Sequence, residues 1–205
     1  QTLPSFRGDI INRSTFTAED REPDPELMLR AYERSGLTLN FIRSLIDGGF
    51  ADLHHPENWD LDWVSHSPMA DQYRRTVQTV ADGLDFFESL TGKSIDQARR
   101  VDFFASHEGL HLPYEQAQTR FLEHRQAWYD LTTHFPWIGV RTSRLDGAHV
   151  EFFRGVRNPI GVKVGPDTTP VFLHGLLRAL NPANEPGRLT LIHRLGAGRI
   201  RQVLP

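Results

Sequence analysis

The chain has 205 residues, a formal net charge of -3 at pH 7, 39% apolar residues and 24% charged residues. This composition is ordinary for a globular protein, and the length suits one compact domain or two small ones. Without a basic excess to neutralise phosphates or a long apolar run, we expect neither a nucleic-acid partner nor a membrane span. The chain contains no cysteine, which excludes disulfides and thiolate metal sites within these residues and favours a cytoplasmic enzyme.

The amino-terminal part of the chain carries the patterns of a loop and two long helices. Residues 1–23 mix turn formers with charges, which indicates a surface segment. Asp24-Pro25-Glu26 is typical of a helix start, and apolar residues at helical spacing predict a helix over 25–47 that ends at a Gly-Gly pair. After a loop rich in Trp and His, a second apolar stripe predicts another helix over about 68–90.

From residue 99 onward, short apolar runs alternate with helical patterns. The runs are Val101–Ala105, Phe135–Val140, Pro159–Val164 and Arg188–His193. Helices are predicted over about 113–127 and from Thr169-Pro170 to about Leu180. Nearly continuous apolar runs indicate strands that are buried on both faces, and such strands belong to parallel sheets with helices packed outside. The chain is therefore predicted to be an α/β protein.

Cationic residues lie at the ends of three of these predicted strands. Arg141 and Arg194 each follow an apolar run, whereas Lys163 lies within one, between Val162 and Val164, where a Lys needs a partner. All but two of the 23 basic residues are Arg, so a Lys here is unusual for this chain. The carboxyl ends of neighbouring parallel strands lie about 5 Å apart at one edge of a sheet, so we expect the three cations within about 10 Å. They would repel one another unless an anion lay between them, which predicts a site for a phosphate together with a carboxylate.

Ordinary structural interpretations compete with these functional ones. An Arg at a strand end is usually a solvated cap. The segment Ser106-His107-Glu108, near Asp102, has the residue types of a nucleophilic triad, but neighbours on a strand point to opposite faces, which favours a hydrogen-bonded structural His. His54-His55 with Glu57 and Asp60 offers metal-ligand types without a usual zinc spacing, and a solvated loop is the favoured interpretation.

Motifs of one enzyme family occur in order along the whole chain. They are Arg7–Asn12, Ser106–Glu108, Trp137–Gly139 with Arg141-Thr142, Asp146–His149, Asn158–Pro166 and Pro186–Leu191. These segments resemble the class II 3-deoxy-D-arabino-heptulosonate 7-phosphate (DAHP) synthases, whose short microbial forms include phenazine-pathway versions. The stretch 137–166 is the most specific part of the resemblance.

The resemblance implies a (β/α)8 TIM barrel with extra amino-terminal helices, of which this chain would cover about strands 3–6. Residues 1–205 would then belong to a single barrel domain, with a loop and helical segment over 1–95 and barrel strands and helices over 96–205. Four barrel strands leave a sheet with two open edges, so we expect these residues to be part of a longer functional unit.

The resemblance also implies a transferase, 3-deoxy-7-phosphoheptulonate synthase, which opens the shikimate pathway toward chorismate and the aromatic amino acids. Phosphoenolpyruvate would condense with erythrose 4-phosphate, water would add to the cationic centre so formed, and inorganic phosphate would leave. Arg141, Lys163 and Arg194 match the residues that bind phosphoenolpyruvate in the family, and Lys163 would also transfer a proton. Members of the family are usually homo-oligomers.

Two departures from the family pattern matter. The family uses a divalent metal (Mn2+, Co2+ or Mg2+) as a Lewis acid, held by one Cys, one His, one Glu and one Asp. The segments with these ligands lie outside the match, so we assign no metal ligand in this chain. Position 140 is Val, where the family commonly has a Glu that helps to hold a water near phosphoenolpyruvate. A second interpretation is therefore a non-catalytic relative that binds phosphometabolites or regulates, and that has lost the metal site.

Overall fold

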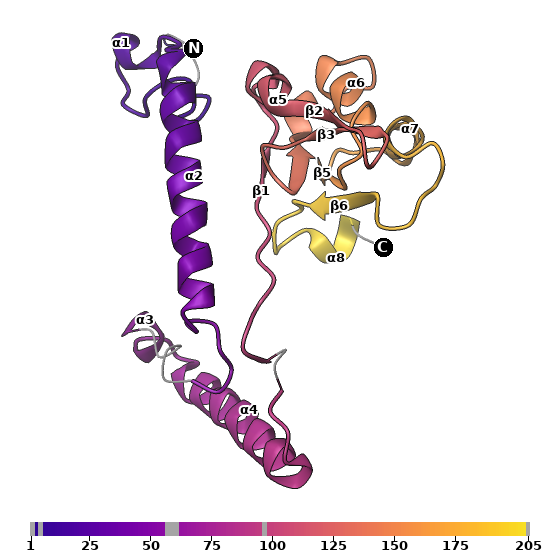
Figure 1. Ribbon diagram of the computed structural model, residues 1–205. Helices are drawn as coiled ribbons and strands as arrows, with labels where there is room; N and C mark the ends of the chain where they lie inside the picture. The colour runs from indigo at the N-terminus through magenta and orange to yellow at the C-terminus, as the bar shows by residue number, and fades with distance from the viewer. Residues whose placement is uncertain (1–2, 4–5, 56–61, 96–97, 204–205) are drawn as a thin grey trace. The chain divides into compact units, whose positions relative to one another are not determined.

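The computed structural model describes residues 3, 6–55, 62–95 and 98–203, and Figure 1 shows its helices and strands in chain order. The chain divides into two compact units, residues 1–103 and residues 104–205. The first unit contains helices and loops, and the strands of the described residues all lie in the second. The predicted cationic residues therefore belong to the second unit.

Two long helices dominate the first unit. Helix α2 spans Glu26–Asp47 and helix α4 spans Ala70–Thr91, which confirms both predicted helices to within two residues. Gly92 ends α4 in the left-handed conformation (φ 63°), and its N–H donates a hydrogen bond to the Glu88 carbonyl. The short helices of this unit are α1 (Ala18–Arg21) and α3 (Asp62–Ser65). Among the helices described, none is long and apolar enough to cross a membrane.

A four-stranded parallel sheet forms the centre of the second unit. Its strands follow the order β1-β4-β5-β6, and each pairs in parallel with its neighbour. Helical connections join the neighbours, as parallel strands require, and the arrangement confirms the predicted α/β class. The strands are β1 (Ser106–Glu108), β4 (Phe135–Ile138), β5 (Ile160–Val164) and β6 (Leu189–His193). The helices are α5 (Leu112–Gln118), η3 (Val140–Thr142, a 3-10 helix), α6 (Ala148–Arg154), α7 (Pro170–Leu180) and α8 (Ile200–Val203).

The helix predicted over 113–127 is wrong in its second half. Helix α5 stops at Gln118, and an antiparallel hairpin follows, made of β2 (Thr119–Leu122) and β3 (Ala127–Asp130). Phe121 and Trp128 face each other across the hairpin with ring centroids 5.7 Å apart. Cross-strand aromatic pairs stabilise two-stranded sheets, and this contact between residues on opposite sides of a turn outweighs the local helical pattern.

The apolar run Val101–Ala105 is not a strand, although one is predicted there. The strand of this region is β1, which begins one residue later, where Ser106 pairs with Phe135 of β4. Phe104 is 69% exposed, so its apolar character does not reflect burial in the sheet. Apolar composition alone therefore misplaced the first strand.

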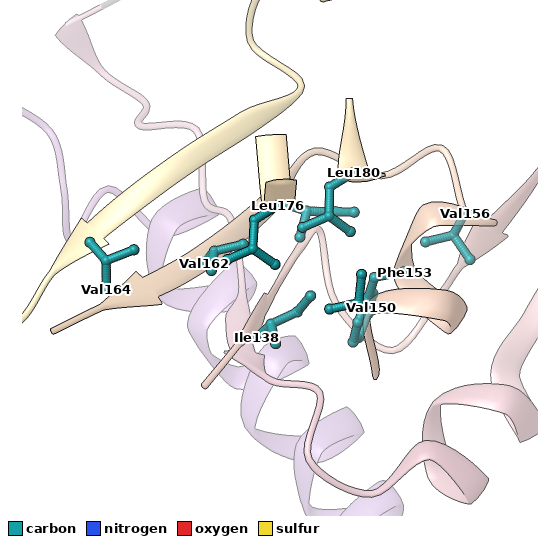
Figure 2. Close-up of a cluster of buried hydrophobic side chains, with 9 residues drawn as sticks. Ile138, Val150, Phe153, Val156, Val162, Val164, Leu176 and Leu180 are labelled. Carbon is teal, nitrogen blue, oxygen red and sulfur yellow. The ribbon is translucent and has the colours of Figure 1, made fainter. Parts of the chain in front are cut away.

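The hydrophobic core is formed by side chains from the sheet, from helices α6 and α7, and from the segment after α6, and Figure 2 shows these side chains. It is formed by Ile138, Val150, Phe153, Val156, Ile160, Val162, Val164, Leu176 and Leu180. Because side chains alternate along a strand, Trp137, Gly161 and Lys163 belong to the opposite face. We call this opposite face, with Glu108 in register beside Trp137, the site face.

Candidate functional site

The carboxyl ends of the parallel strands lie at one edge of the sheet, and the predicted cations lie at this edge. Lys163 is the fourth residue of β5, and Arg194 directly follows β6. Arg141 lies in η3, three residues after the end of β4. The charges of Lys163 and Arg194 act on each other. Arg141 is exposed to solvent. The structure thus brings Lys163 and Arg194 within electrostatic reach, with Arg141 at the same edge.

Lys163 lies over an aromatic ring on the site face. Its Nζ is 3.1 Å from the centroid of the Trp137 ring, whose electron-rich face attracts the ammonium. Gly161 is in register with Trp137, and a Cβ on Gly161 would come within 2.8 Å of the Trp137 Cβ. Partial burial lowers the pKa of Lys163, the carboxylate of Glu108 opposes this shift, and Arg194 adds to it. Lys163 therefore gives up its proton more readily than an ordinary lysine.

Glu108 and Trp137 belong to this site, but neither is among the predicted site residues. Glu108 ends β1 in register with Trp137. Its carboxylate lies against Gly139, where an added Cβ would collide with it. Both residues lie near the carboxyl end of a predicted parallel strand, and this position could have indicated them. The prediction considered only cationic residues at strand ends and therefore missed an acidic and an aromatic one.

A cavity of about 630 Å³ opens at the same edge of the sheet. Arg194 and Val140 line it, together with the loop after β5, which contributes Asp167. Lys163 and Arg141 are not among the described residues on its wall. A cavity of this size accommodates a small phosphorylated molecule, and Arg194 supplies a cation at its boundary.

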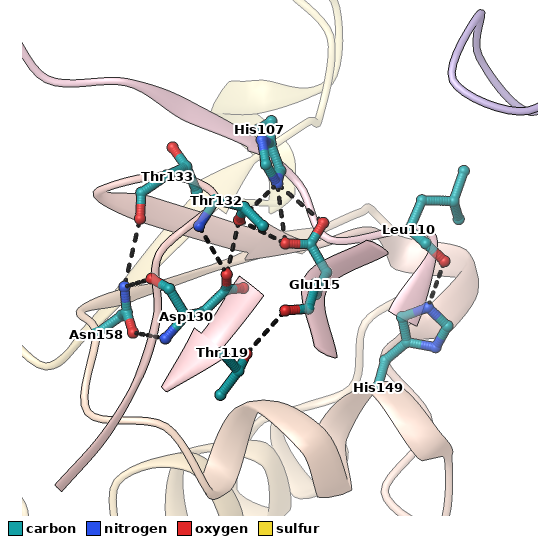
Figure 3. A network of polar contacts seen from close by, with 9 residues as sticks. All are labelled: His107, Leu110, Glu115, Thr119, Asp130, Thr132, Thr133, His149 and Asn158. Atoms are coloured by element: carbon teal, nitrogen blue, oxygen red, sulfur yellow. Dashed lines mark hydrogen bonds and ion pairs between the residues drawn. The ribbon is translucent and has the colours of Figure 1, made fainter. Parts of the chain in front are cut away.

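His107 points away from the site face into a buried polar network, which Figure 3 shows. Its Nε2 lies 2.9 Å from Oε1 of Glu115, and the Thr132 hydroxyl lies 2.6 Å from Oε2 of Glu115 and 2.7 Å from Oδ1 of Asp130. The expected hydrogen-bonded structural His is thereby confirmed. A triad of His107 with Glu108 is excluded, because their side chains belong to opposite faces of the sheet.

The two carboxyl groups of this network titrate together. Glu115 is 2% exposed and Asp130 is 1% exposed. The Thr132 hydroxyl contacts both carboxyl groups but can donate its single hydrogen to only one of them at a time. Burial raises the pKa of Asp130 to about 6, and the neighbouring Glu115 contributes to the rise. Burial also opposes ionisation of Glu115, but interactions with His107, Thr132 and Asp130 outweigh it and lower its pKa. As the pH rises, Glu115, which contacts His107, therefore loses its proton at a lower pH than Asp130 does.

Two residues of the family motifs hold the scaffold together (Figure 3). Asn158, which is buried, accepts a hydrogen bond from the Asp130 N–H at 2.9 Å and donates one to the Asp130 carbonyl at 2.8 Å. His149 of α6 donates to the Leu110 carbonyl at 2.9 Å. These bonds fix β3 to the start of β5, and α6 to the segment after β1, so both motif residues have structural roles.

The His-rich loop of the first unit differs from the solvated loop that we expected. His54 has a side chain that is 18% exposed, and its ring nitrogens contact Asp52 at 2.5 Å and Glu88 at 2.9 Å. These hydrogen bonds raise the pKa of His54, that to Asp52 most of all. Glu57 and Asp60 lie outside the described residues. Within the described residues, no group of three His, Cys, Asp or Glu side chains could hold a metal ion.

Fold and site together define an α/β protein that presents cations at the carboxyl edge of a parallel sheet. The chain belongs to the class-II DAHP synthetase family, whose family model matches residues 1–205. The resemblance inferred from the motifs is thereby confirmed.

Curated proteins from three organisms are similar to nearly the whole chain. The phospho-2-dehydro-3-deoxyheptonate aldolase of Neurospora crassa is 43% identical over 217 residues, covering 99% of this chain and 45% of that protein. The protein of the same name from Streptomyces coelicolor is 43% identical over 204 residues, covering 100% of this chain and 45% of that protein. Phospho-2-dehydro-3-deoxyheptonate aldolase AroG of Mycolicibacterium smegmatis is 40% identical over 208 residues, covering 99% of this chain and 45% of that protein. The chain therefore spans about half the length of the curated relatives that it matches.

Proposed function

We propose that the protein containing this chain condenses phosphoenolpyruvate with erythrose 4-phosphate to give DAHP and inorganic phosphate. The observation that carries the proposal is Lys163, stacked on Trp137 within reach of Arg194, in a chain that the family model matches over its whole length. The names of the relatives support the same reaction. As a biosynthetic enzyme of this family, the protein is expected to be a cytoplasmic homo-oligomer without nucleic-acid or membrane partners.

We infer further that the sheet is part of a TIM barrel and contributes about strands 3–6 of eight. The support is its topology: strands that follow one another in sequence are neighbours in the sheet, all in parallel. In a barrel the site face would be the interior, and the carboxyl edge would be the end that carries active sites. Residues 1–205 would then form part of a single barrel domain.

The proposed roles follow from charge. Arg194 and Arg141 neutralise the phosphate and carboxylate of phosphoenolpyruvate, because guanidinium forks bind both groups well. Lys163 binds the same anion and transfers a proton, which its lowered pKa favours. The described residues do not fit the divalent metal that the family uses, so its ligands are expected in the rest of the protein.

The kinetic test uses the full-length protein with phosphoenolpyruvate and erythrose 4-phosphate. Lys163→Ala and Arg194→Ala should each reduce kcat/KM by more than about tenfold, which corresponds to about 1.4 kcal/mol of transition-state stabilisation. The matched controls are Lys93→Ala and Arg178→Ala, which remove the same side chains from exposed positions. The proposal would be contradicted if the two site variants kept more than about a tenth of the natural kcat/KM and so behaved like the control variants.

The alternative is a relative that binds a phosphometabolite without converting it. It is favoured by Val140, an apolar side chain on the cavity wall, where the resemblance leads us to expect Glu. A full-length protein that binds phosphoenolpyruvate but forms no DAHP with any of Mn2+, Co2+ and Mg2+ would establish this alternative. Product formation would exclude it.

A further inference from the structure

Glu108 is an acidic residue on the site face, where Lys163 of β5 is basic and a second basic residue, Arg194, follows β6. It ends β1, in register with Trp137 of β4. Its carboxylate fills the space above Gly139, where a Cβ would collide with it. The position of the Glu108 side chain therefore depends on the absence of a side chain at residue 139.

Three neighbouring strands place Glu108, Trp137 and Lys163 next to one another on the site face. Trp137 lies in register with Glu108 on one side and with Gly161 on the other, and Lys163 follows Gly161 by two residues. The Lys163 Nζ lies 3.1 Å from the centroid of the Trp137 ring. Glu108 and Lys163 therefore belong to the two strands that flank β4, one on each side of Trp137.

Burial and a neighbouring cation both favour loss of the proton of Lys163. Partial burial removes water from the ammonium, and Arg194 at the end of β6 repels it. From β4 the neighbour is the Trp137 ring, which carries no net charge but attracts the ammonium through its electron-rich face. Among the described residues, the charged groups that act on Lys163 are Glu108 and Arg194, and Glu108 is the one that favours the charged form.

We propose that Glu108 is a positioning residue that keeps Lys163 protonated and directed toward the bound anion. The inference rests on the proposed function, because it assigns Lys163 to the anion site. Without Glu108, Lys163 would lose its proton at a lower pH. A neutral amine neither attracts phosphoenolpyruvate nor donates a proton to it.

The test measures the titration of Lys163 itself in the full-length protein. Lysine side chains are labelled with carbon-13, and the Lys163 signal is identified by its loss in a Lys163→Arg variant. The variant Glu108→Gln keeps the shape of the side chain and removes its charge. We expect it to lower the proton affinity of Lys163 about tenfold, which is about one pKa unit.

Activity provides a second measurement. In Glu108→Gln, the alkaline limb of the profile of kcat/KM against pH should move to lower pH together with the Lys163 titration. The loss should be about tenfold on that limb and under about threefold at the acid end of the profile, because acid favours protonated Lys163 in either protein. A residue that only supports the fold would reduce activity at all pH values alike.

Further variants guard against unfolding and general charge effects. Gly139→Ala keeps Glu108 but displaces its carboxylate, so the Lys163 titration should shift in the same direction. Glu108→Asp retains the charge and should restore part of the effect. Glu123→Gln, in the exposed turn between β2 and β3, is the charge-matched control and should leave Lys163 unchanged.

The outcomes distinguish this inference from the proposed function. An unchanged Lys163 titration in folded Glu108→Gln or Gly139→Ala protein overturns the role of Glu108, whatever the activity. A shifted titration in a protein that forms no DAHP supports the role of Glu108 and contradicts the proposed reaction.

Discussion

Val140 lines the cavity beside Arg194 with 50% of its surface exposed. A carboxylate at this position would lie near Arg194 and cancel part of its attraction for anions. We therefore expect Val140→Glu to weaken the binding of inorganic phosphate about fivefold, roughly 1 kcal/mol, in calorimetric titrations. Turnover should rise, because the resemblance assigns a water-holding role to Glu here. Val140→Gln is the neutral control, and tighter phosphate binding by the Glu variant would contradict the argument.

Asp130 makes stability depend on pH. Its folded-state pKa of about 6 lies above the ordinary value of 3.8, so the folded protein holds this proton more tightly than the unfolded chain does. The proton on Asp130 therefore stabilises the folded protein fully below about pH 4, and this stabilisation is lost as the pH rises through about 6. The free energy of unfolding falls by at most about 3 kcal/mol over this range. Asp130→Asn removes this dependence and keeps a polar group beside Thr132.

Thermal unfolding midpoints at pH 4.5 and pH 7.5 test this expectation. The midpoint of Asp130→Asn, taken relative to the natural protein, should be higher at pH 7.5 than at pH 4.5. Asp146→Asn is the control, because Asp146 is exposed and pairs with Arg144 at 3.0 Å, and an exposed pair contributes little. Equal relative midpoints for Asp130→Asn at the two pH values would show that Asp130 titrates normally.

At the scale of elements, helix α6 packs against the end of β1 at one close contact. Gly109 follows β1, and a Cβ there would collide with the ring of Phe153, which is fully buried in α6. Gly109→Ala should destabilise the protein by about 1–3 kcal/mol through overpacking. Phe153→Leu leaves a smaller side chain, so the double variant should lose less stability than the sum of the two single losses.

Denaturant unfolding of the natural protein, both single variants and the double variant measures this coupling. Residues in contact typically couple by about 0.5–3 kcal/mol. Gly36→Ala, on α2 with nothing within 4 Å of an added Cβ, is the control and should be neutral or stabilising by up to about 1 kcal/mol. If the stability losses of Gly109→Ala and Phe153→Leu added strictly in the double variant, Phe153 of α6 would not pack against Gly109.

At the scale of the whole molecule, the sheet of the second unit has β1 and β6 at its edges. Unpaired strand edges favour association with other chains. Large apolar side chains are also exposed on the long helices, among them Leu37 (74%), Phe41 (63%) and Leu90 (72%). We therefore expect a polypeptide of residues 1–205 alone to associate, to bind a hydrophobic dye, and to form no DAHP.

Light scattering after size-exclusion chromatography tests this expectation, with the full-length protein as the control. Association and dye binding should be confined to the shorter polypeptide. A monomer of 23.5 kDa that unfolds cooperatively would contradict both the open edges and the proposed barrel.

The sequence by itself determined the features that depend on local pattern. The helical spacing of apolar residues and the terminal glycines predicted α2 and α4, and Thr169-Pro170 predicted the start of α7. Continuous apolar runs predicted the parallel sheet, because strands covered on both faces have no polar side. The family motifs predicted membership of the family, which the family model confirms.

Only the tertiary structure decided which side chains meet. The hairpin after Gln118 depends on a contact between Phe121 and Trp128 across a turn, which outweighs helical propensity. Likewise, Glu108 and Lys163 are 55 residues apart, and only the register of β1, β4 and β5 brings both to the site face on either side of Trp137. Local patterns cannot fix such registers, because pairing between distant strands depends on the packing of the whole sheet.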